Sequence, residues 1–295
     1  SNPPFEAFYP LIILSDFQHI LVTGGCGYKG TVLIPKLIAR GYQVTVVDTL
    51  WFGNFLEPHK NLSVLQVDTR NTNDIPIRNV DTIIHLASIA NDPCGDLNPK
   101  LTWEVGALAT MQLADKAVRA GVKQFIYASS GSVYGVKKED QVTEDLELKP
   151  ISEYNKTKMV AERALLSYGD KMIVQIVRPA TVCGYSSRMR LDVSVNMLTL
   201  QALANGVITV FGGNQTRPNI HIDDICNFYI DCININSLQI HKNCKLEPSL
   251  ANATLKDKFQ FIRHGYFVLD PQSNKNTLIF NQSVSLRDNW AKKNQ

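Results

Sequence analysis

Three glycines spaced three residues apart constrain the fold of this chain more than any other feature. Gly24, Gly27 and Gly30 lie in the stretch ILVTGGCGYKG at residues 20–30, which follows an apolar run and opens a segment of helical pattern. A pyrophosphate is bound by backbone N–H groups at the start of a helix, and glycine lets the backbone turn sharply and come close to the phosphates. The stretch therefore predicts a strand, a dinucleotide-binding turn and a helix. The alternative is an ordinary tight turn that is rich in glycine.

The pattern of apolar runs predicts the rest of the fold. From residue 19 onward, continuous apolar runs alternate with segments of helical period, which is typical of a parallel sheet covered by helices on both faces. Right-handed crossovers then give an α/β doubly wound parallel Rossmann sheet. The expected strands lie at residues 19–25, 43–48, 62–68, 80–88, 123–130 and 172–179, and the expected helices at 30–41, 102–121 and 152–169.

The chain changes character after about residue 232. Residues 243–290 lack a helical period and contain short strand-like runs separated by clusters of Asn, Ser, Asp, Pro and Lys. We therefore expect three parts: an N-terminal extension at 1–18, a Rossmann domain at 19–234, and a β-rich tail at 235–295. The boundary is expected near 233–237.

Two acids follow the next strands at positions where a bound dinucleotide would meet them. Asp48 ends the second apolar run, about eighteen residues after Gly30, close to the spacing at which an acid accepts hydrogen bonds from the adenosine ribose. Because a carboxylate repels a 2′-phosphate, this acid favours NAD over NADP. Asp68 ends the third run, where it could reach the adenine. The alternative for both acids is a solvated aspartate at a strand end.

A tyrosine and a lysine four residues apart suggest proton chemistry. Tyr154 and Lys158 in SEYNKTK fall on one face of the expected helix, and Ser130 ends the fifth apolar run. A phenol is a poor base at neutral pH, but a neighbouring ammonium favours the phenolate. Ser130 could bind and orient a substrate hydroxyl at the sheet edge where such folds place their ligands. Taken alone, a tyrosine and a lysine at this spacing are more often two exposed neighbours on a helix.

Further motifs in a fixed order resemble one known family. VTGGCGYKG, VVD, HLAS, ASSGSVYG, YNKTK, VRPATVCG and RPNIHIDD, spread over residues 19–232, resemble the extended short-chain dehydrogenase/reductases, in particular the NAD-dependent epimerase/dehydratase family acting on nucleotide sugars. The resemblance implies a catalytic Ser130, Tyr154 and Lys158, NAD held by Gly24, Gly27, Gly30 and Asp48, and a cofactor cleft lined by the backbone of Leu86 and Ala87.

The same resemblance implies a substrate and a quaternary state. Arg217 in TRPNIHIDD falls where the family contacts the diphosphate of a nucleotide sugar, and an arginine suits phosphate recognition. The alternative is a surface arginine in a loop. A homodimer formed through a helix pair that includes the Tyr154 helix is also implied.

Two departures from the family pattern bear on function. Gly131 and Ser132 stand where the 4,6-dehydratases of the family carry an Asp–Glu pair, so elimination of water lacks its usual proton donor and acceptor. Epimerisation or simple oxidoreduction is therefore favoured. Gly106 stands where the family has asparagine in a long helix, and we expect it to loosen that helix.

The tail has a resemblance of its own. Stretches such as EPSL, GYF and LRDNWAK, within residues 235–292, resemble the C-terminal anticodon-binding end of bacterial glutaminyl-tRNA synthetase. In that family the region helps to hold the tRNA, so Arg263, His264 and Tyr266 could contact RNA. The chain has no HIGH-type or KMSKS-type motif, and we do not expect it to act as a synthetase or to bind nucleic acid. Together the two resemblances imply that residues 19–234 are an NAD-binding Rossmann domain with an incomplete substrate lobe, and that the tail at 235–295 is of foreign origin. The alternative for the tail is a divergent substrate lobe.

Composition excludes several other classes. The net charge of +3 does not by itself indicate nucleic-acid or membrane partners, and no apolar run approaches the ~20 residues of a membrane span. Six scattered cysteines without a C-x-x-C pair predict no metal site and fit a reduced, cytoplasmic protein. The leading hypothesis is an NAD-dependent nucleotide-sugar epimerase or related oxidoreductase, impaired if the lobe is replaced. The alternatives are an NAD-binding module without turnover and a tRNA-binding remnant.

Overall fold

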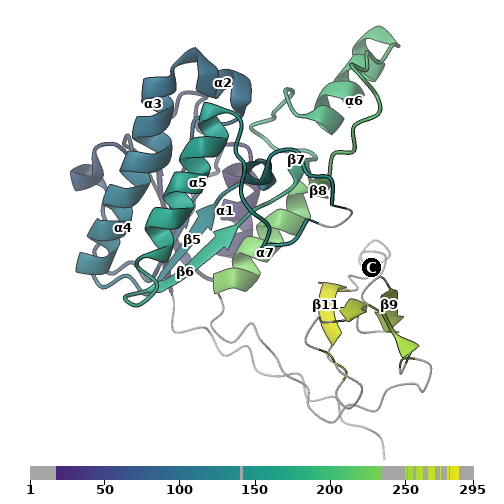
Figure 1. The fold of residues 1–295 in the computed structure, drawn as a ribbon. Helices are drawn as coiled ribbons and strands as arrows, with labels where there is room; N and C mark the ends of the chain where they lie inside the picture. Colours follow the sequence, from purple (N-terminus) through teal and green to yellow (C-terminus); the bar gives the residue numbers. More distant parts are fainter. Residues whose placement is uncertain are drawn as a thin grey trace, which may run out of the picture. The chain divides into compact units, whose positions relative to one another are not determined.

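The apolar runs form one parallel sheet of six strands in the order β3-β2-β1-β4-β5-β6. Figure 1 labels β5 and β6 of this sheet and the helices around it. The structure is a computed structural model, and it describes residues 18–139, 142–233, 250, 252–254, 257–261, 265–269, 273, 278 and 280–285. The strands are β1 (His19–Thr23), β2 (Gln43–Asp48), β3 (Leu62–Gln66), β4 (Thr82–His85), β5 (Gln124–Ala128) and β6 (Ile173–Val177). Because the chain runs outward from β1 to β3 and then returns to β4, the carboxyl ends of β1 and β4 form a switch point where such sheets bind ligands. The predicted doubly wound fold is confirmed.

Helices cover both faces of this sheet. They are α1 (Gly30–Ala39), α2 (Asp92–Leu97), α3 (Pro99–Trp103), α4 (Ala109–Arg119), α5 (Glu153–Leu166), α6 (Ser194–Asn205) and α7 (Ile222–Ile233). One apolar core contains Leu33 of α1 and Ile230 of α7, and a second core on the other face contains Leu113 of α4 and Leu165 of α5. Burial on both faces explains why the strands are uninterrupted apolar runs in the sequence.

The helix expected over residues 102–121 is not continuous. A π-helical turn at Glu104–Leu108 joins α3 to α4. Gly106 lies in this turn, and a Cβ added there would lie 2.7 Å from Thr157 Oγ1 on α5. The absence of a side chain thus lets the turn pack directly against α5. The expectation that Gly106 loosens the helix stays a prediction; the structure shows a π-helical turn at this glycine in place of a regular α-helix.

A small lobe follows the sheet. β7 (Thr181–Cys183) pairs in parallel with β8 (Asn219–His221), and α6 lies between them in the sequence. Asn196 is the one buried residue of α6, and Leu203 and Phe211 are 82% and 80% exposed. The lobe therefore has little core of its own, as expected for an incomplete substrate lobe. None of the described helices has the length and apolarity to cross a membrane.

The chain divides into two compact units, Ser1–Leu238 and Gln239–Gln295. In the second unit, β9 (Lys258–Phe261), β10 (Gly265–Leu269) and β11 (Phe280–Ser285) form an antiparallel sheet in the order β11-β10-β9. This agrees with the β-rich tail expected from the sequence. The extension at 1–18 and the boundary near 233–237 fall almost entirely outside the described residues and stay predictions, and Arg263 and His264 lie outside them as well.

Candidate active site

The first glycine of the loop is fixed by its backbone. Gly24 has a φ of +69°, and its N–H donates to the carbonyl of Val47 at the end of β2 at 2.7 Å. A Cβ on Gly24 would lie 2.7 Å from both Cα and N of Ala87, which follows β4 with Leu86. A residue with a side chain does not fit here. The loop therefore lies directly against the backbone of Leu86 and Ala87, which the resemblance had placed in the cofactor cleft.

The other two glycines have different surroundings. A Cβ on Gly30 would lie 2.1 Å from the carbonyl oxygen of Gly25, so the start of α1 packs against the loop itself. A Cβ on Gly27 would have one neighbour within 4 Å, the carbonyl oxygen of Gly24 at 3.2 Å. Gly30 is thus needed for the packing of the helix on the loop, whereas Gly27 leaves a bare backbone that lines a cavity.

The two predicted acids lie beside this loop. Asp48 accepts hydrogen bonds from the N–H of Cys26 at 3.0 Å and from the N–H of Leu50 at 2.9 Å, one on each carboxylate oxygen. Each oxygen keeps a lone pair for a ribose hydroxyl. Asp68 pairs with Arg70 at 2.7 Å, and the hydrogen bonds from Arg70 lower the pKa of Asp68. Both acids line the same cavity.

One cavity of about 940 Å³ connects these residues with the predicted catalytic ones. Its volume lies at the upper end of the range for small-molecule and cofactor sites. The predicted site residues that line it are Gly24, Gly27, Gly30, Asp48, Asp68, Leu86, Ala87, Ser130, Tyr154 and Arg217. Lys158 does not line the cavity. The described residues contain no cluster of acids, histidines and cysteines that could hold a metal ion.

The hydroxyls of Ser130 and Tyr154 meet at the edge of this cavity. Ser130 follows β5, its Oγ lies 2.5 Å from Ser132 Oγ, and it shares a hydrogen bond with the Tyr154 phenol. Tyr154 is in the first turn of α5, whose N-cap Ser152 accepts a hydrogen bond from the N–H of Asn155. Burial raises the pKa of Tyr154 to about 12, while Arg190 and the hydrogen bond with Ser130 lower it.

Lys158 lies one turn further along α5 and is buried. Its Nζ donates to the carbonyl of Ala128 at 2.8 Å and lies 5.8 Å from the centre of the Tyr154 ring. Burial lowers the pKa of Lys158 to about 7; the nearby Lys29 lowers it further, and Glu162 raises it. The expected depression of the tyrosine pKa by this lysine is not found, because burial raises that pKa and the groups that lower it are Arg190 and Ser130.

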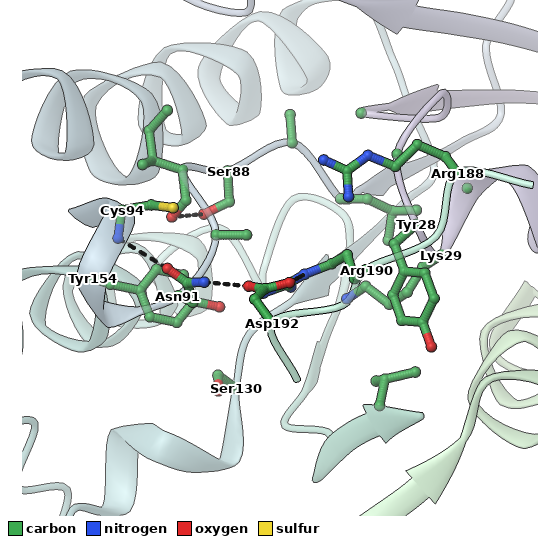
Figure 2. A pocket seen from close by; sticks show the side chains of 18 of the residues that line it. Tyr28, Lys29, Ser88, Asn91, Cys94, Ser130, Tyr154, Arg188, Arg190 and Asp192 are labelled. Atoms are coloured by element: carbon green, nitrogen blue, oxygen red, sulfur yellow. Dashed lines mark hydrogen bonds and ion pairs between the residues drawn. The ribbon is translucent and has the colours of Figure 1, made fainter. Parts of the chain in front are cut away.

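A polar cluster beside Tyr154 was not found from the sequence. Arg190 pairs with Asp192 at 2.5 Å, and the side-chain amide of Asn91 donates to the same carboxylate. Figure 2 shows Asn91, Asp192 and Arg190 in a row next to Tyr154. Asn91 follows β4 with a φ of +76°, which a non-glycine residue rarely adopts, so the loop is constrained at this point. The close spacing of Arg188, Arg190 and Asp192 in RMRLD was the available signal.

Comparison with known proteins identifies the family of the chain. The sequence model of the NAD dependent epimerase/dehydratase family matches residues 20–236. The chain belongs to this family. NAD is the family's cofactor, and the residues present fit it: a glycine loop whose Gly27 leaves bare backbone on the cavity, and an acid, Asp48, at the end of β2.

Individual relatives include several nucleotide-sugar enzymes. UDP-glucuronic acid decarboxylase 1 of Danio rerio is 31% identical over 246 residues, which cover 78% of this chain and 58% of the relative, so the chain spans little more than half of that protein. The structure of MoeE5 in complex with UDP-glucuronic acid and NAD is 28% identical with a TM-score of 0.64, covering 76% of this chain and 73% of that one. A UDP-glucose 4-epimerase from Thermotoga maritima is 25% identical with a TM-score of 0.67, and each chain is 73% covered.

The tail has a separate match. The anti-codon binding domain of class I tRNA synthetases (E and Q) matches residues 215–270, which overlaps the end of the first match. The resemblance of the tail to a glutaminyl-tRNA synthetase is thereby confirmed.

Proposed function

We propose that this chain is an NAD-dependent nucleotide-sugar epimerase or a closely related oxidoreductase, in which Ser130, Tyr154 and Lys158 carry out hydride transfer at a carbinol carbon of the sugar. The observation that carries the proposal is the single cavity that joins the glycine cradle to the hydroxyls of Ser130 and Tyr154. A cofactor in the cradle and a sugar hydroxyl at Tyr154 would therefore occupy one continuous space.

In the first step Tyr154 would accept the proton of a sugar hydroxyl, as the hydrogen on the same carbon leaves as hydride. The C–H bond breaks, the C–O bond becomes a carbonyl, and the electron pair of the C–H bond leaves with the hydride. When bound, NAD supplies the hydride acceptor. Return of the hydride to the opposite face of the carbonyl, with return of the proton from Tyr154, gives the epimer.

The charges around Tyr154 decide when it can act as a base. Its pKa of about 12 is too high for a base at neutral pH, because the buried phenolate is poorly solvated. Arg190 already favours the phenolate. A protonated Lys158 and the positive nicotinamide ring act in the same direction, so cofactor binding is expected to lower the pKa of Tyr154.

The arginines at the cavity suit an anionic substrate. Arg190 lies beside Tyr154 and Arg217 lines the same cavity, so a diphosphate could be bound at the substrate end. Relatives that act on UDP-sugars support a nucleotide sugar as the substrate. In place of an acid pair after Ser130, the site has Gly131 and the hydroxyl of Ser132, which favours epimerisation over dehydration.

The test is direct observation of product. NAD-loaded protein is incubated with UDP-, GDP- and dTDP-sugars, and the sugar is examined by NMR for inversion at one carbon. We expect an epimer with at least one of these substrates and none with Tyr154→Phe. If the protein binds NAD and yet changes none of the sugars, the proposal is wrong.

A second candidate is an NAD-binding module without turnover. The exposed apolar side chains of Leu203 and Phe211 and the synthetase-like match over residues 215–270 favour it, because both indicate a substrate lobe that differs from the family's. NAD binding without a sugar product in the NMR experiment would support this candidate. For the tRNA-binding alternative, we expect no shift of tRNA in a gel assay at moderate salt.

A further inference from the structure

Two loops from distant parts of the sequence meet at the adenosine end of the cavity. Phe52 lies in the loop after β2, and Arg188 lies in the loop between β7 and α6. The guanidinium carbon of Arg188 lies 3.7 Å from the centre of the Phe52 ring, which is a close stacking contact. Both residues line the cavity, and Phe52 is 62% exposed. An exposed aromatic ring is thus covered on one face by an arginine from the opposite loop.

The Arg188 loop is fixed to the glycine loop. The phenol of Tyr28 donates to the carbonyl of Gly184 at 2.7 Å, and the hydroxyl of Ser186 donates to the carbonyl of Tyr28 at 2.8 Å. The hydroxyls of Ser186 and Thr31 lie 2.6 Å apart. Since Tyr28 and Thr31 flank the last glycine of the cradle, Arg188 is held at a defined place relative to the site of the pyrophosphate.

Most N–H donors of the Arg188 guanidinium make no hydrogen bond to the described residues. Within the described residues its hydrogen bonding to protein is one contact, from Nη1 to the carbonyl of Met189 at 3.4 Å, and it makes no ion pair there. A guanidinium carries five N–H donors. Burial and Arg190 lower the pKa of Arg188, while Asp192 and Asp48 raise it, so the group remains a cation in the field of Asp48.

The neighbours of the arginines separate their roles. Arg190 lies beside Tyr154 at the substrate end, whereas Arg188 lies over the Phe52 ring, well apart from Tyr154 (Figure 2). The adenosine of NAD is uncharged, and the pyrophosphate next to it carries the negative charge of that half of the cofactor. A cation at this end therefore has the pyrophosphate as its anionic partner.

We propose that Arg188 is a cofactor-binding residue that binds the NAD pyrophosphate and, stacked on Phe52, closes the adenosine end of the cavity so that NAD stays bound between turnovers. The inference rests on NAD as the cofactor and does not depend on which sugar is turned over. A retained cofactor fits a reaction in which the hydride returns to the sugar, since no exchange of reduced for oxidised cofactor is then required.

The test measures cofactor release, without substrate. Full-length wild type, Arg188→Met and the control Arg119→Met, which removes an exposed arginine paired with Asp115 on α4, are loaded with NAD. Dissociation is followed after dilution or by competition. A charge-assisted hydrogen bond contributes about 1.5–3 kcal/mol, so we expect Arg188→Met to release NAD about ten times faster or more, and Arg119→Met to match the wild type. A change of less than about twofold in Arg188→Met would overturn the proposal.

Ligand fragments separate the pyrophosphate contact from a general effect on the loop. Arg188→Met should weaken ADP-ribose about as much as NAD and leave adenosine binding unchanged, because adenosine lacks the pyrophosphate. Equal weakening of adenosine and ADP-ribose would contradict the assignment. Phe52→Leu should speed NAD release without changing how the release rate depends on salt. Arg188→Met should reduce that salt dependence, because it removes the charge. Thermal unfolding without NAD checks that each variant is folded.

Discussion

Two alanine substitutions in the glycine loop should have different effects, one on the stability of the fold and the other on NAD binding. A Cβ at Gly30 would lie 2.1 Å from the carbonyl oxygen of Gly25, far inside ordinary contact, and the obstacle is backbone that cannot rotate away. Overpacking of this kind costs about 3 kcal/mol or more, so Gly30→Ala should lower the melting temperature by roughly 6–12 °C. NAD binding would be lost along with the local structure.

Gly27→Ala should leave the stability nearly unchanged and weaken NAD binding. Its Cβ would meet one atom, the carbonyl oxygen of Gly24 at 3.2 Å, so the stability should change by less than about 1 kcal/mol. The methyl group would occupy the space that the pyrophosphate needs. Loss of one charge-assisted hydrogen bond, about 1.5–3 kcal/mol, should weaken NAD binding about tenfold to 150-fold.

The assay is calorimetric NAD titration beside thermal unfolding of the cofactor-free protein. Gly169→Ala is the matched control, because its Cβ would lie 3.3 Å from the carbonyl oxygen of Leu166, a similar contact outside the cavity. Gly169→Ala should bind NAD like the wild type. Unchanged NAD affinity in Gly27→Ala, with the control unchanged as well, would refute the assignment of this loop as the pyrophosphate cradle.

Three further changes test the surroundings of the site. Tyr154→Phe should lower kcat by about 10²–10⁴ while NAD affinity stays the same, as measured by steady-state kinetics and calorimetry. The pKa of Lys158 falls from 10.5 to about 7 on folding, so the folded protein releases this proton first and its stability rises with pH above about 7. Compared with the wild type, Lys158→Met should therefore gain stability at low pH relative to high pH. Denaturant unfolding of both proteins at two pH values measures this difference, which would be absent if burial did not lower the pKa of Lys158. Gly106→Ala should lower the free energy of unfolding by about 1–3 kcal/mol, because the new Cβ would collide with Thr157. Adding Thr157→Ala should restore part of this stability. An unchanged melting temperature in Gly106→Ala would contradict the close packing of the π-helical turn on α5.

Sequence reasoning predicted the Rossmann sheet well because its signals are local. Buried parallel strands are continuous apolar runs, and Gly30 is dictated by its contact with Gly25 within one strand–turn–helix unit. The helix over 102–121 was predicted as regular, since a π-helical turn depends on packing against α5 through Gly106 and Thr157, which lie far apart in the sequence.

The site was predicted less completely. Ser130, Tyr154 and Arg217 do line one cavity, but Arg190, Asp192 and Asn91 were missed, because they come from two loops with no regular spacing. The pKa of Tyr154 was expected to be lowered by the lysine and is instead raised by burial, since sequence spacing gives proximity and not burial. The function of the tail does not follow from local patterns. It matches a tRNA-synthetase domain, yet it follows an epimerase/dehydratase domain in the same chain.

The measurement that most directly tests the central claim follows the fate of one hydrogen. A nucleotide sugar carrying deuterium at the carbon that inverts is incubated with the NAD-loaded protein, and sugar and cofactor are analysed by mass spectrometry after rapid quenching. Hydride transfer at Tyr154 predicts that the deuterium appears in the reduced cofactor during turnover and is kept in the epimeric product. An epimer whose deuterium has been replaced by hydrogen from water would show that inversion proceeds by proton abstraction, and would contradict the account.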